Sequence, residues 1–197
     1  SLGFTEQKIR EGSHICYIFN DDDERYLTMM KFLQSGAQEN EKVLYLVDTE
    51  EVASFTDKIR KLGFDIRNED IITVNQATSA YCPDGSFSIS KMVENIKELY
   101  LDSQKENFSG ARISGEMSWA LTEGIVKNTD LIEYEALINK ILVDYPSTAC
   151  CQYDARKFDG ATILDILKVH PQMIIRGQVY NNPYYVEPDI FLKTLKR

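Results

Sequence analysis

Short apolar runs alternate with longer amphipathic segments along almost the whole chain. Each apolar run is nearly continuous, which is typical of parallel strands that are buried on both faces. The sequence therefore predicts strands at residues 14–19, 42–48, 71–74 and 147–154, with one more that begins at Ala111 and ends where Gly115 interrupts it.

The segments between these runs carry apolar residues at intervals of three or four, the spacing of one face of a helix. Met29, Met30 and Leu33, for example, follow an acidic loop at residues 20–24 that offers a capping Asp or Asn. Helices are predicted at residues 26–36 or shortly beyond, 52–62, 88–103, 130–142, 159–169 and 187–197. A polar loop is predicted at residues 75–85, and a β-hairpin at residues 173–175 and 178–180.

This order of elements predicts a single α/β domain over residues 1–197. Strands that alternate with helices build a mainly parallel sheet with helices on both faces, so we expect three layers and a C-terminal β-hairpin. No repeat, linker or low-complexity segment divides the chain. A length of 197 residues suits one domain with a sizeable core.

The charge and the cysteines narrow the classes of function. The net charge is −9, which argues against a nucleic-acid surface because phosphate binding depends on Lys and Arg. No apolar run is long enough to span a membrane, and no signal peptide is visible. Cys16, Cys82, Cys150 and Cys151 form no CxxC pair, and three of them lie in apolar runs. This pattern favours a reducing, cytoplasmic setting over a disulfide framework.

Candidate binding residues follow two of the predicted strands. In α/β proteins, ligands bind where parallel strands end, at the carboxyl edge of the sheet. Glu116 and the only tryptophan, Trp119, follow one strand, and Tyr153 with Asp154 ends another. The alternative interpretation is that Trp119 packs in the core and that the acids cap the helices that follow.

A histidine and two thiols form a second group of candidates. His14 and Cys16 are two positions apart, so they share one face of their strand, as do Cys151 and Tyr153 on another strand. If the two strands are neighbours, these groups converge as a metal site, a Cys–His nucleophile or a polar patch in a ligand pocket. Metal binding needs three or four donors, and the chain has only two histidines, so we expect neither a metal site nor a catalytic residue. The structural alternative is a hydrogen-bonded His14 beside a core Cys16.

The order of strands and helices in the first half resembles a RecA or KaiC-type ATPase core. Such cores carry GxxxxGK[ST] after the first strand, because glycine amides and a lysine bind the phosphates. This chain instead reads NDDDERYL at residues 20–27, without glycine or lysine, and its acids would repel a triphosphate. The resemblance therefore implies a degenerate phosphate loop and no standard ATP hydrolysis.

A resemblance to the MEDS family, the methanogen/methylotroph DcmR sensory domain, covers nearly the whole chain. It rests on the segments GSHICYIF (12–19), GEMSWAL (115–121), LVDYPSTACCQYD (142–154), VHP (169–171) and YNNPYY (180–185). The family implies sensing of small organic compounds, hydrocarbon derivatives in particular, by domains that occur alone or joined to histidine kinases and DNA-binding regulators. The length of this chain fits the sensory domain, so we expect the output to come from a partner chain or from a part outside this sequence.

The sequence therefore predicts a non-enzymatic sensory domain that binds a small organic ligand near the carboxyl edge of the sheet. No cofactor, nucleic acid or membrane is expected, and the expected partners are a histidine kinase or a DNA-binding regulator, with homo-oligomerisation left open. One alternative is a degenerate nucleotide-binding domain, and another is a cysteine- or metal-dependent enzyme. The predicted ligand-binding residues are His14, Cys16, Glu116, Trp119, Tyr153 and Asp154.

Overall fold

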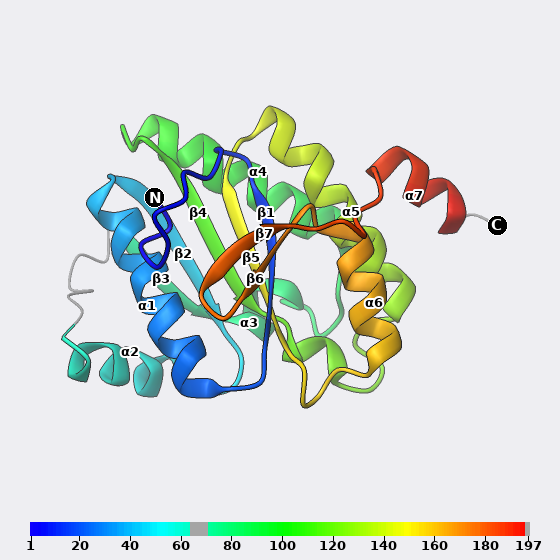
Figure 1. Cartoon of the computed structure of the whole chain (residues 1–197), viewed down its shortest axis with the longest axis horizontal. Coiled ribbons are helices and arrows are strands. Elements are labelled where there is room, and N and C mark those ends of the chain that lie inside the picture. The colour runs from blue at the N-terminus through cyan, green and yellow to red at the C-terminus, as the bar shows by residue number, and fades with distance from the viewer. Residues whose placement is uncertain (64–70, 196–197) are drawn as a thin grey trace.

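A computed structural model describes residues 1–63 and 71–195, within which seven strands form one sheet (Figure 1). The order of the strands across the sheet is β3-β2-β4-β5-β1-β6-β7. All neighbouring pairs are parallel except β6 and β7, which form the predicted antiparallel hairpin. The strands are β1 (His14–Phe19), β2 (Glu41–Val47), β3 (Ile72–Gln76), β4 (Gly110–Glu116), β5 (Thr148–Asp154), β6 (Gln172–Ile175) and β7 (Gln178–Asn181).

Helices cover both faces of this sheet and confirm the predicted three layers. Helices α1 (Asp22–Gln38) and α2 (Val52–Lys61) contribute to one hydrophobic core. The core on the opposite face is built with α3 (Ala77–Tyr81), α4 (Ile89–Lys105), α5 (Asn128–Asp144), α6 (Gly160–Val169) and α7 (Pro188–Leu195). Within the described residues, no helix is both long and apolar enough to cross a membrane.

Polar side chains fix where several helices begin. The Asp21 carboxylate accepts a hydrogen bond of 2.8 Å from the backbone N–H of Glu24, which caps α1 as the acidic loop predicted. Asp22, Asp23 and Glu24 then place negative charge in the first turn, where the helix dipole favours it. Asp159 caps α6 in the same way through the N–H of Thr162. The start of α1, which lies against the carboxyl ends of the strands, is therefore well determined by local contacts.

Two segments differ from the sequence-based prediction. The predicted polar loop at 75–85 contains the end of β3 and the short helix α3, which buries Ala77 and Tyr81. Gly115 does not end β4, because its backbone continues the parallel pairing with Leu46 and Cys151. The helix predicted at 187–197 is observed as α7, while residues 196 and 197 lie outside the described part of the chain.

The absence of a side chain at Gly115 makes room for Tyr81. A Cβ atom at this position would approach Tyr81 Oη more closely than non-bonded atoms normally do, while the next atom, Tyr81 Cζ, would lie at 3.4 Å. We expect Gly115→Ala to lower the free energy of unfolding by about 1–3 kcal/mol, the usual cost of overpacking a core. Urea denaturation followed by circular dichroism measures this loss.

Tyr81→Phe is the matched background for this test. It removes the clashing oxygen, so Gly115→Ala should cost much less in a chain that already carries Tyr81→Phe. An equal cost in both backgrounds would show that the hydroxyl of Tyr81 is not what requires a glycine at position 115.

Candidate functional site

The sheet divides the predicted ligand-binding residues between its two faces. Adjacent strand residues point in opposite directions, so Tyr153 and Asp154 lie on opposite sides of β5. The side covered by α5 holds His14, Cys16, Trp119 and Tyr153, and the side covered by α1 holds Glu116 and Asp154. All of these side chains are buried. The structure therefore does not bring them into one site, and their role in ligand binding stays a prediction.

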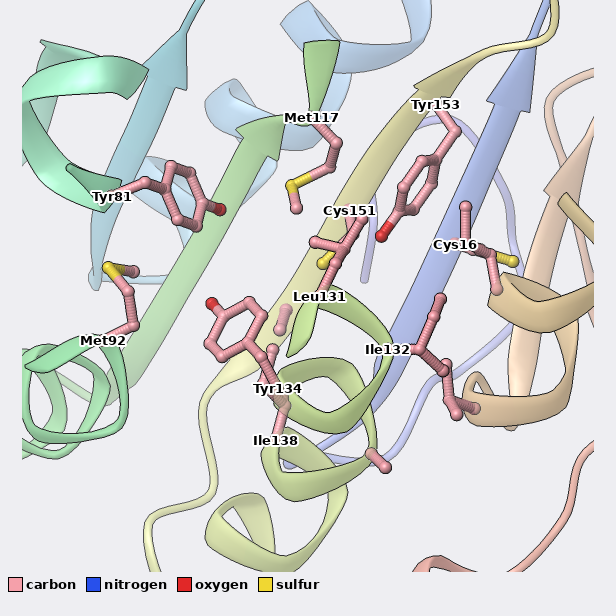
Figure 2. Close-up of a cluster of buried hydrophobic side chains, with 14 of the residues drawn as sticks. Cys16, Tyr81, Met92, Met117, Leu131, Ile132, Tyr134, Ile138, Cys151 and Tyr153 are labelled. Atoms are coloured by element: carbon pink, nitrogen blue, oxygen red, sulfur yellow. The ribbon is translucent and has the colours of Figure 1, made fainter. Parts of the chain in front are cut away.

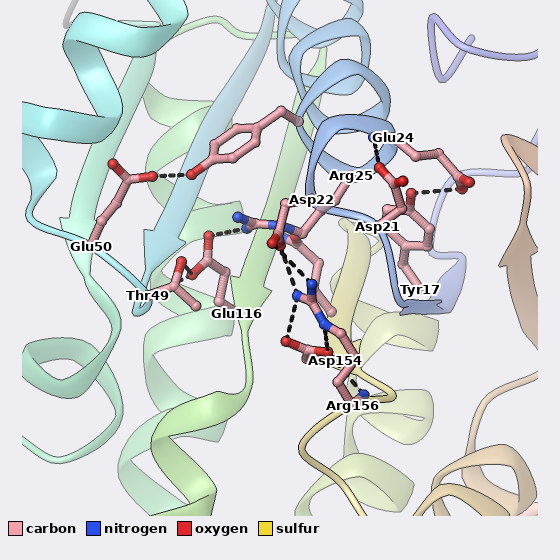
Figure 3. A network of polar contacts seen from close by, with 12 residues as sticks. Tyr17, Asp21, Asp22, Glu24, Arg25, Thr49, Glu50, Glu116, Asp154 and Arg156 are labelled. Carbon is pink, nitrogen blue, oxygen red and sulfur yellow. Dashed lines mark hydrogen bonds and ion pairs between the residues drawn. The ribbon is translucent and has the colours of Figure 1, made fainter.

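Glu116 is the centre of a polar network at the carboxyl edge of the sheet. Its Oε1 accepts hydrogen bonds from Arg25 Nη1 at 2.5 Å and from Tyr45 Oη at 3.0 Å. Its Oε2 accepts hydrogen bonds from the backbone N–H groups of Asp48 and Thr49 and from Thr49 Oγ1, at 2.8–2.9 Å. Figure 3 shows Thr49 beside Glu116. This carboxylate has no position left for a ligand. We call this arrangement the Arg25–Glu116 network.

The cation of this network comes from the first turns of α1. Arg25 is 2% exposed, and its guanidinium also lies 4.5 Å from the ring centroid of Tyr26. Burial favours the neutral form of this side chain, but Tyr45 and Glu116 together raise the pKa of Arg25. The guanidinium therefore stays charged and forms a buried ion pair with Glu116.

Asp154 is occupied by a second ionic contact beside this network. Arg156 donates to Asp154 through Nε and Nη2, each at 2.8 Å, and its Nη2 also lies 2.9 Å from Asp22 Oδ1 (Figure 3). These hydrogen bonds from Arg156 lower the pKa of both carboxyl groups. They tie the start of α1 to the end of β5. The chain's own charged groups therefore occupy the region between β1 and α1 where a phosphate loop would hold a nucleotide.

A second polar group lies on the opposite face, between β1, β5 and α5. Its members are His14, Glu135, Cys151, Tyr153 and His170, which we call the buried polar cluster. Glu135 Oε2 lies 3.1 Å from His14 Nε2, 3.4 Å from His170 Nε2 and 3.5 Å from Cys151 Sγ. Tyr153 donates its hydroxyl to Glu135 Oε1 at 2.5 Å. The strands of His14 and Cys151 are neighbours, as the sequence argument required, but Glu135 of α5 is what joins them.

The orientation of both imidazole rings is fixed by their Nδ1 atoms. Asn139 donates from Nδ2 to the carbonyl oxygens of Val169 and Glu135, so its Oδ1 faces His14 Nδ1 at 3.1 Å. His170 Nδ1 lies 2.8 Å from the carbonyl oxygen of Ile166. Each Nδ1 therefore carries a proton, and each Nε2 points toward Glu135.

Burial controls the charges in this cluster. Burial and the neighbouring His170 lower the pKa of His14 to about 4, so its imidazole is neutral at pH 7. Burial opposes the charge on Glu135, but the two neighbouring imidazoles, His14 and His170, lower the pKa of this carboxyl group. Burial raises the pKa of the Cys151 thiol well above its usual range. A buried neutral thiol is a poor nucleophile, so the geometry does not favour a Cys–His catalytic pair here.

Cys16 stands apart from these contacts. Its Sγ lies 3.6 Å from the carbonyl oxygen of Gln172, on the neighbouring strand β6. Burial raises the pKa of this thiol as well. Cys16 therefore behaves as a core residue beside the buried polar cluster.

An aromatic cluster lies next to the buried polar cluster at the end of β4. Trp119, in the 3₁₀ helix η1 (Ser118–Leu121), stacks on Tyr81 with ring centroids 4.5 Å apart. Phe87 lies 5.1 Å from Trp119 and 5.3 Å from Tyr134. Tyr81 and Tyr134 direct their hydroxyl groups toward a region that Met117 and Cys151 also border (Figure 2). Within residues 1–63 and 71–195, the buried Nε1 of Trp119 has no hydrogen-bond partner.

Sequence reasoning missed Glu135, His170 and Tyr81 as parts of these clusters. His170 directly follows the helix predicted at residues 159–169, and Tyr81 lies within the polar loop predicted at residues 75–85. One signal for Glu135 was present, because it lies four positions after Leu131 and three before Ile138, on the apolar stripe of α5. An acid on a buried stripe needs a buried partner, and that requirement points to His14 and His170.

Comparisons with known proteins agree with the fold. The family model described as MEDS, methanogen/methylotroph, DcmR sensory domain, matches residues 13–171. The transcriptional repressor DcmR of Methylorubrum extorquens is 33% identical over 82 residues, which cover 41% of this chain and 31% of the repressor. The alignment thus spans about a third of that protein's length.

Solved structures show the same architecture at low sequence identity. The KaiC-like protein PH0186 of Pyrococcus horikoshii OT3 has a TM-score of 0.59 and 15% identity, and the match covers 83% of this chain and 70% of the PH0186 chain. The flagellar accessory protein FlaH of Methanocaldococcus jannaschii has a TM-score of 0.62 and 12% identity, and the match covers 91% of this chain and 83% of the FlaH chain. The predicted RecA-like core is therefore confirmed as a fold.

The Arg25–Glu116 network predicts a large stability cost when one charge is removed. Glu116→Gln keeps the shape of the side chain but leaves the buried guanidinium unpaired, so the free energy of unfolding should fall by about 3–5 kcal/mol. Urea denaturation followed by circular dichroism measures the difference. The control is Glu94→Gln, which breaks the exposed pair with Lys97 and should change stability by at most about 0.5 kcal/mol. Similar small losses for both variants would contradict the structural role of Glu116.

Proposed function

Since this chain belongs to the MEDS family of methanogen/methylotroph DcmR-type sensory domains, we propose that it is a non-enzymatic sensor of a small organic molecule. Family membership and the relative that is a transcriptional repressor support a regulatory role. In addition to this regulatory role, we propose the class of the ligand and of the signalling partner.

The unpaired indole N–H of Trp119 is the observation that carries the proposal. A buried donor without an acceptor costs about 1–3 kcal/mol, so a ligand that supplies an acceptor atom would recover that energy. The surrounding rings of Tyr81, Phe87 and Tyr134 offer apolar contact to the rest of a small molecule. An alcohol, a carbonyl compound or a halogenated hydrocarbon fits this combination. The proposed ligand site is therefore the aromatic cluster.

Signalling requires that the ligand favours one of two conformations. The aromatic cluster joins α3 and η1, which are short elements, to the long helix α5 through Tyr134. A ligand held between them would change how η1 and α3 sit on α5. The proposed reader of this change is a DNA-binding regulator or a histidine kinase, supplied by another chain or another part of the protein.

The runner-up function, nucleotide binding without a standard phosphate loop, is less well supported. Arg25 and Arg156 satisfy Glu116, Asp154 and Asp22, which are the acids near the place where a nucleotide and its metal would bind. A phosphate group there would need both ion pairs to open. We therefore place the ligand on the opposite face of the sheet.

Intrinsic fluorescence tests the proposal, because Trp119 is the only tryptophan. The protein is titrated with one- to three-carbon alcohols, aldehydes and haloalkanes, and in parallel with Mg-ATP. We expect a saturable change with at least one organic compound and none with Mg-ATP. A fluorescence change with Mg-ATP alone would favour nucleotide binding. No fluorescence change with any compound would show that the aromatic cluster is not the ligand site.

A pair of tyrosine variants locates the binding site. Tyr81→Leu removes the ring that stacks on Trp119 and should weaken binding of the organic compound at least tenfold. Tyr100→Leu is the control, since Tyr100 lies on α4 and its ring pairs with Tyr145, which is outside the aromatic cluster. Equal affinities in the two variants would place the ligand away from the aromatic cluster.

A further inference from the structure

We propose that His14, Glu135, Cys151 and His170 bind one divalent transition-metal ion of the zinc class. This inference goes beyond the proposed sensing function, because the aromatic cluster can bind an organic molecule without it. The sequence argued against a metal because it showed only two histidines and no paired cysteines. The structure supplies what that argument lacked, since α5 places Glu135 between both histidines and Cys151.

The separations of the donor atoms suit a tetrahedral ion. Zinc bonds of about 2.0–2.3 Å place neighbouring donors roughly 3.3–3.8 Å apart in a tetrahedron. Glu135 Oε2 lies 3.1, 3.4 and 3.5 Å from the donors of His14, His170 and Cys151, and Cys151 Sγ lies 3.6 Å from His14 Nε2. All of the donor atoms lie within 4.8 Å of one another. Small side-chain adjustments would therefore complete the coordination.

The hydrogen bonds around the histidines prepare them as ligands. Both Nδ1 atoms are engaged, His14 with Asn139 and His170 with the carbonyl of Ile166, which is the outer-shell arrangement found around metal-bound histidines. Each Nε2 lone pair then faces the carboxylate of Glu135, a contact between electron-rich atoms. Within the described residues, His170 Nε2 has no hydrogen-bond partner. A cation between these atoms would convert the contact into coordination.

The charges of the proposed site sum to zero. A divalent ion contributes +2, the Glu135 carboxylate and a Cys151 thiolate contribute −1 each, and both imidazoles are neutral. Binding breaks the S–H bond of Cys151, forms a sulfur–metal bond and releases one proton to solvent, with no change of oxidation state. A neutral centre is the form that a fully buried site tolerates best. Two protonated imidazoles with their centroids 4.0 Å apart beside one carboxylate would leave a buried positive charge.

The donors come from separate parts of the fold, so an ion would connect them. His14 and Cys151 lie on β1 and β5, Glu135 lies on α5, and His170 follows α6. Asn139, one turn after Glu135, also borders a surface pocket of about 420 Å³ between α5 and residues 185–189.

Cobalt substitution tests the site with a spectroscopic signal. The full chain, with any affinity tag removed, is refolded with Co²⁺ and dialysed. We expect one cobalt per chain, visible d–d bands of tetrahedral intensity and a near-ultraviolet thiolate-to-cobalt charge-transfer band. Cys151→Ser should abolish that band, and Glu135→Gln should weaken metal binding at least tenfold. Less than a tenth of an equivalent of both cobalt and zinc after refolding would overturn the proposal.

Cys150→Ser is the matched control, because Cys150 is the adjacent buried cysteine on the opposite face of β5. It should keep the charge-transfer band, and loss of the band in this variant alone would overturn the assignment of Cys151. If Cys151→Ser does not fold by circular dichroism, X-ray absorption of the wild-type zinc form decides. One sulfur and three nitrogen or oxygen neighbours support the site, and a shell of oxygen atoms alone refutes it.

Discussion

The buried ion pair between Arg25 and Glu116 determines what the carboxyl edge of this sheet can do. The guanidinium enters from the first turns of α1, and the carboxylate ends β4, so the pair holds together two elements that are far apart in the sequence. Tyr45 and the backbone of Asp48 and Thr49 complete the shell of the carboxylate. Breaking such a pair is costly because the remaining charge stays buried. In this RecA-like core, an internal ion pair thus occupies the carboxyl edge of the sheet.

Because the acids at the carboxyl edge of the sheet are already paired, the groups that we propose for binding lie on the face covered by α5. There, the aromatic cluster and the buried polar cluster each contain a buried polar atom that has no hydrogen-bond partner among the described residues, Trp119 Nε1 and His170 Nε2, and Arg25 Nε is such an atom on the face covered by α1. Unsatisfied buried groups are costly in a folded protein, and each one needs an explanation. The alternation of β5 explains the division, since Cys151 and Tyr153 face α5 while Asp154 faces α1. One strand therefore contributes both to the rigid edge and to the proposed binding face.

The hydrophobic pattern was sufficient for the fold and insufficient for the site. Continuous apolar runs identify buried parallel strands, and capping residues such as Asp21 and Asp159 mark helix starts, because both signals are local. The partners of Glu116 are not local: Arg25 precedes it by 91 residues and sits among acids that suggest solvent exposure. The sequence predicts that Gly115 ends its strand, whereas in the structure Gly115 leaves room for Tyr81. The two histidines looked unrelated until the fold placed Glu135 between them.

The guanidinium resonances of Arg25 test most directly whether the buried ion pair with Glu116 occupies the carboxyl edge of the sheet. In a nitrogen-15 NMR spectrum at neutral pH, we expect resolved, slowly exchanging Arg25 protons that do not shift when Mg-ATP is added. Arg60 serves as the internal reference, because its side chain is half exposed and forms a surface ion pair with Asp57. Arg25 protons that exchange as fast as those of Arg60, or that shift saturably with Mg-ATP, would show that the buried ion pair does not occupy this edge of the sheet.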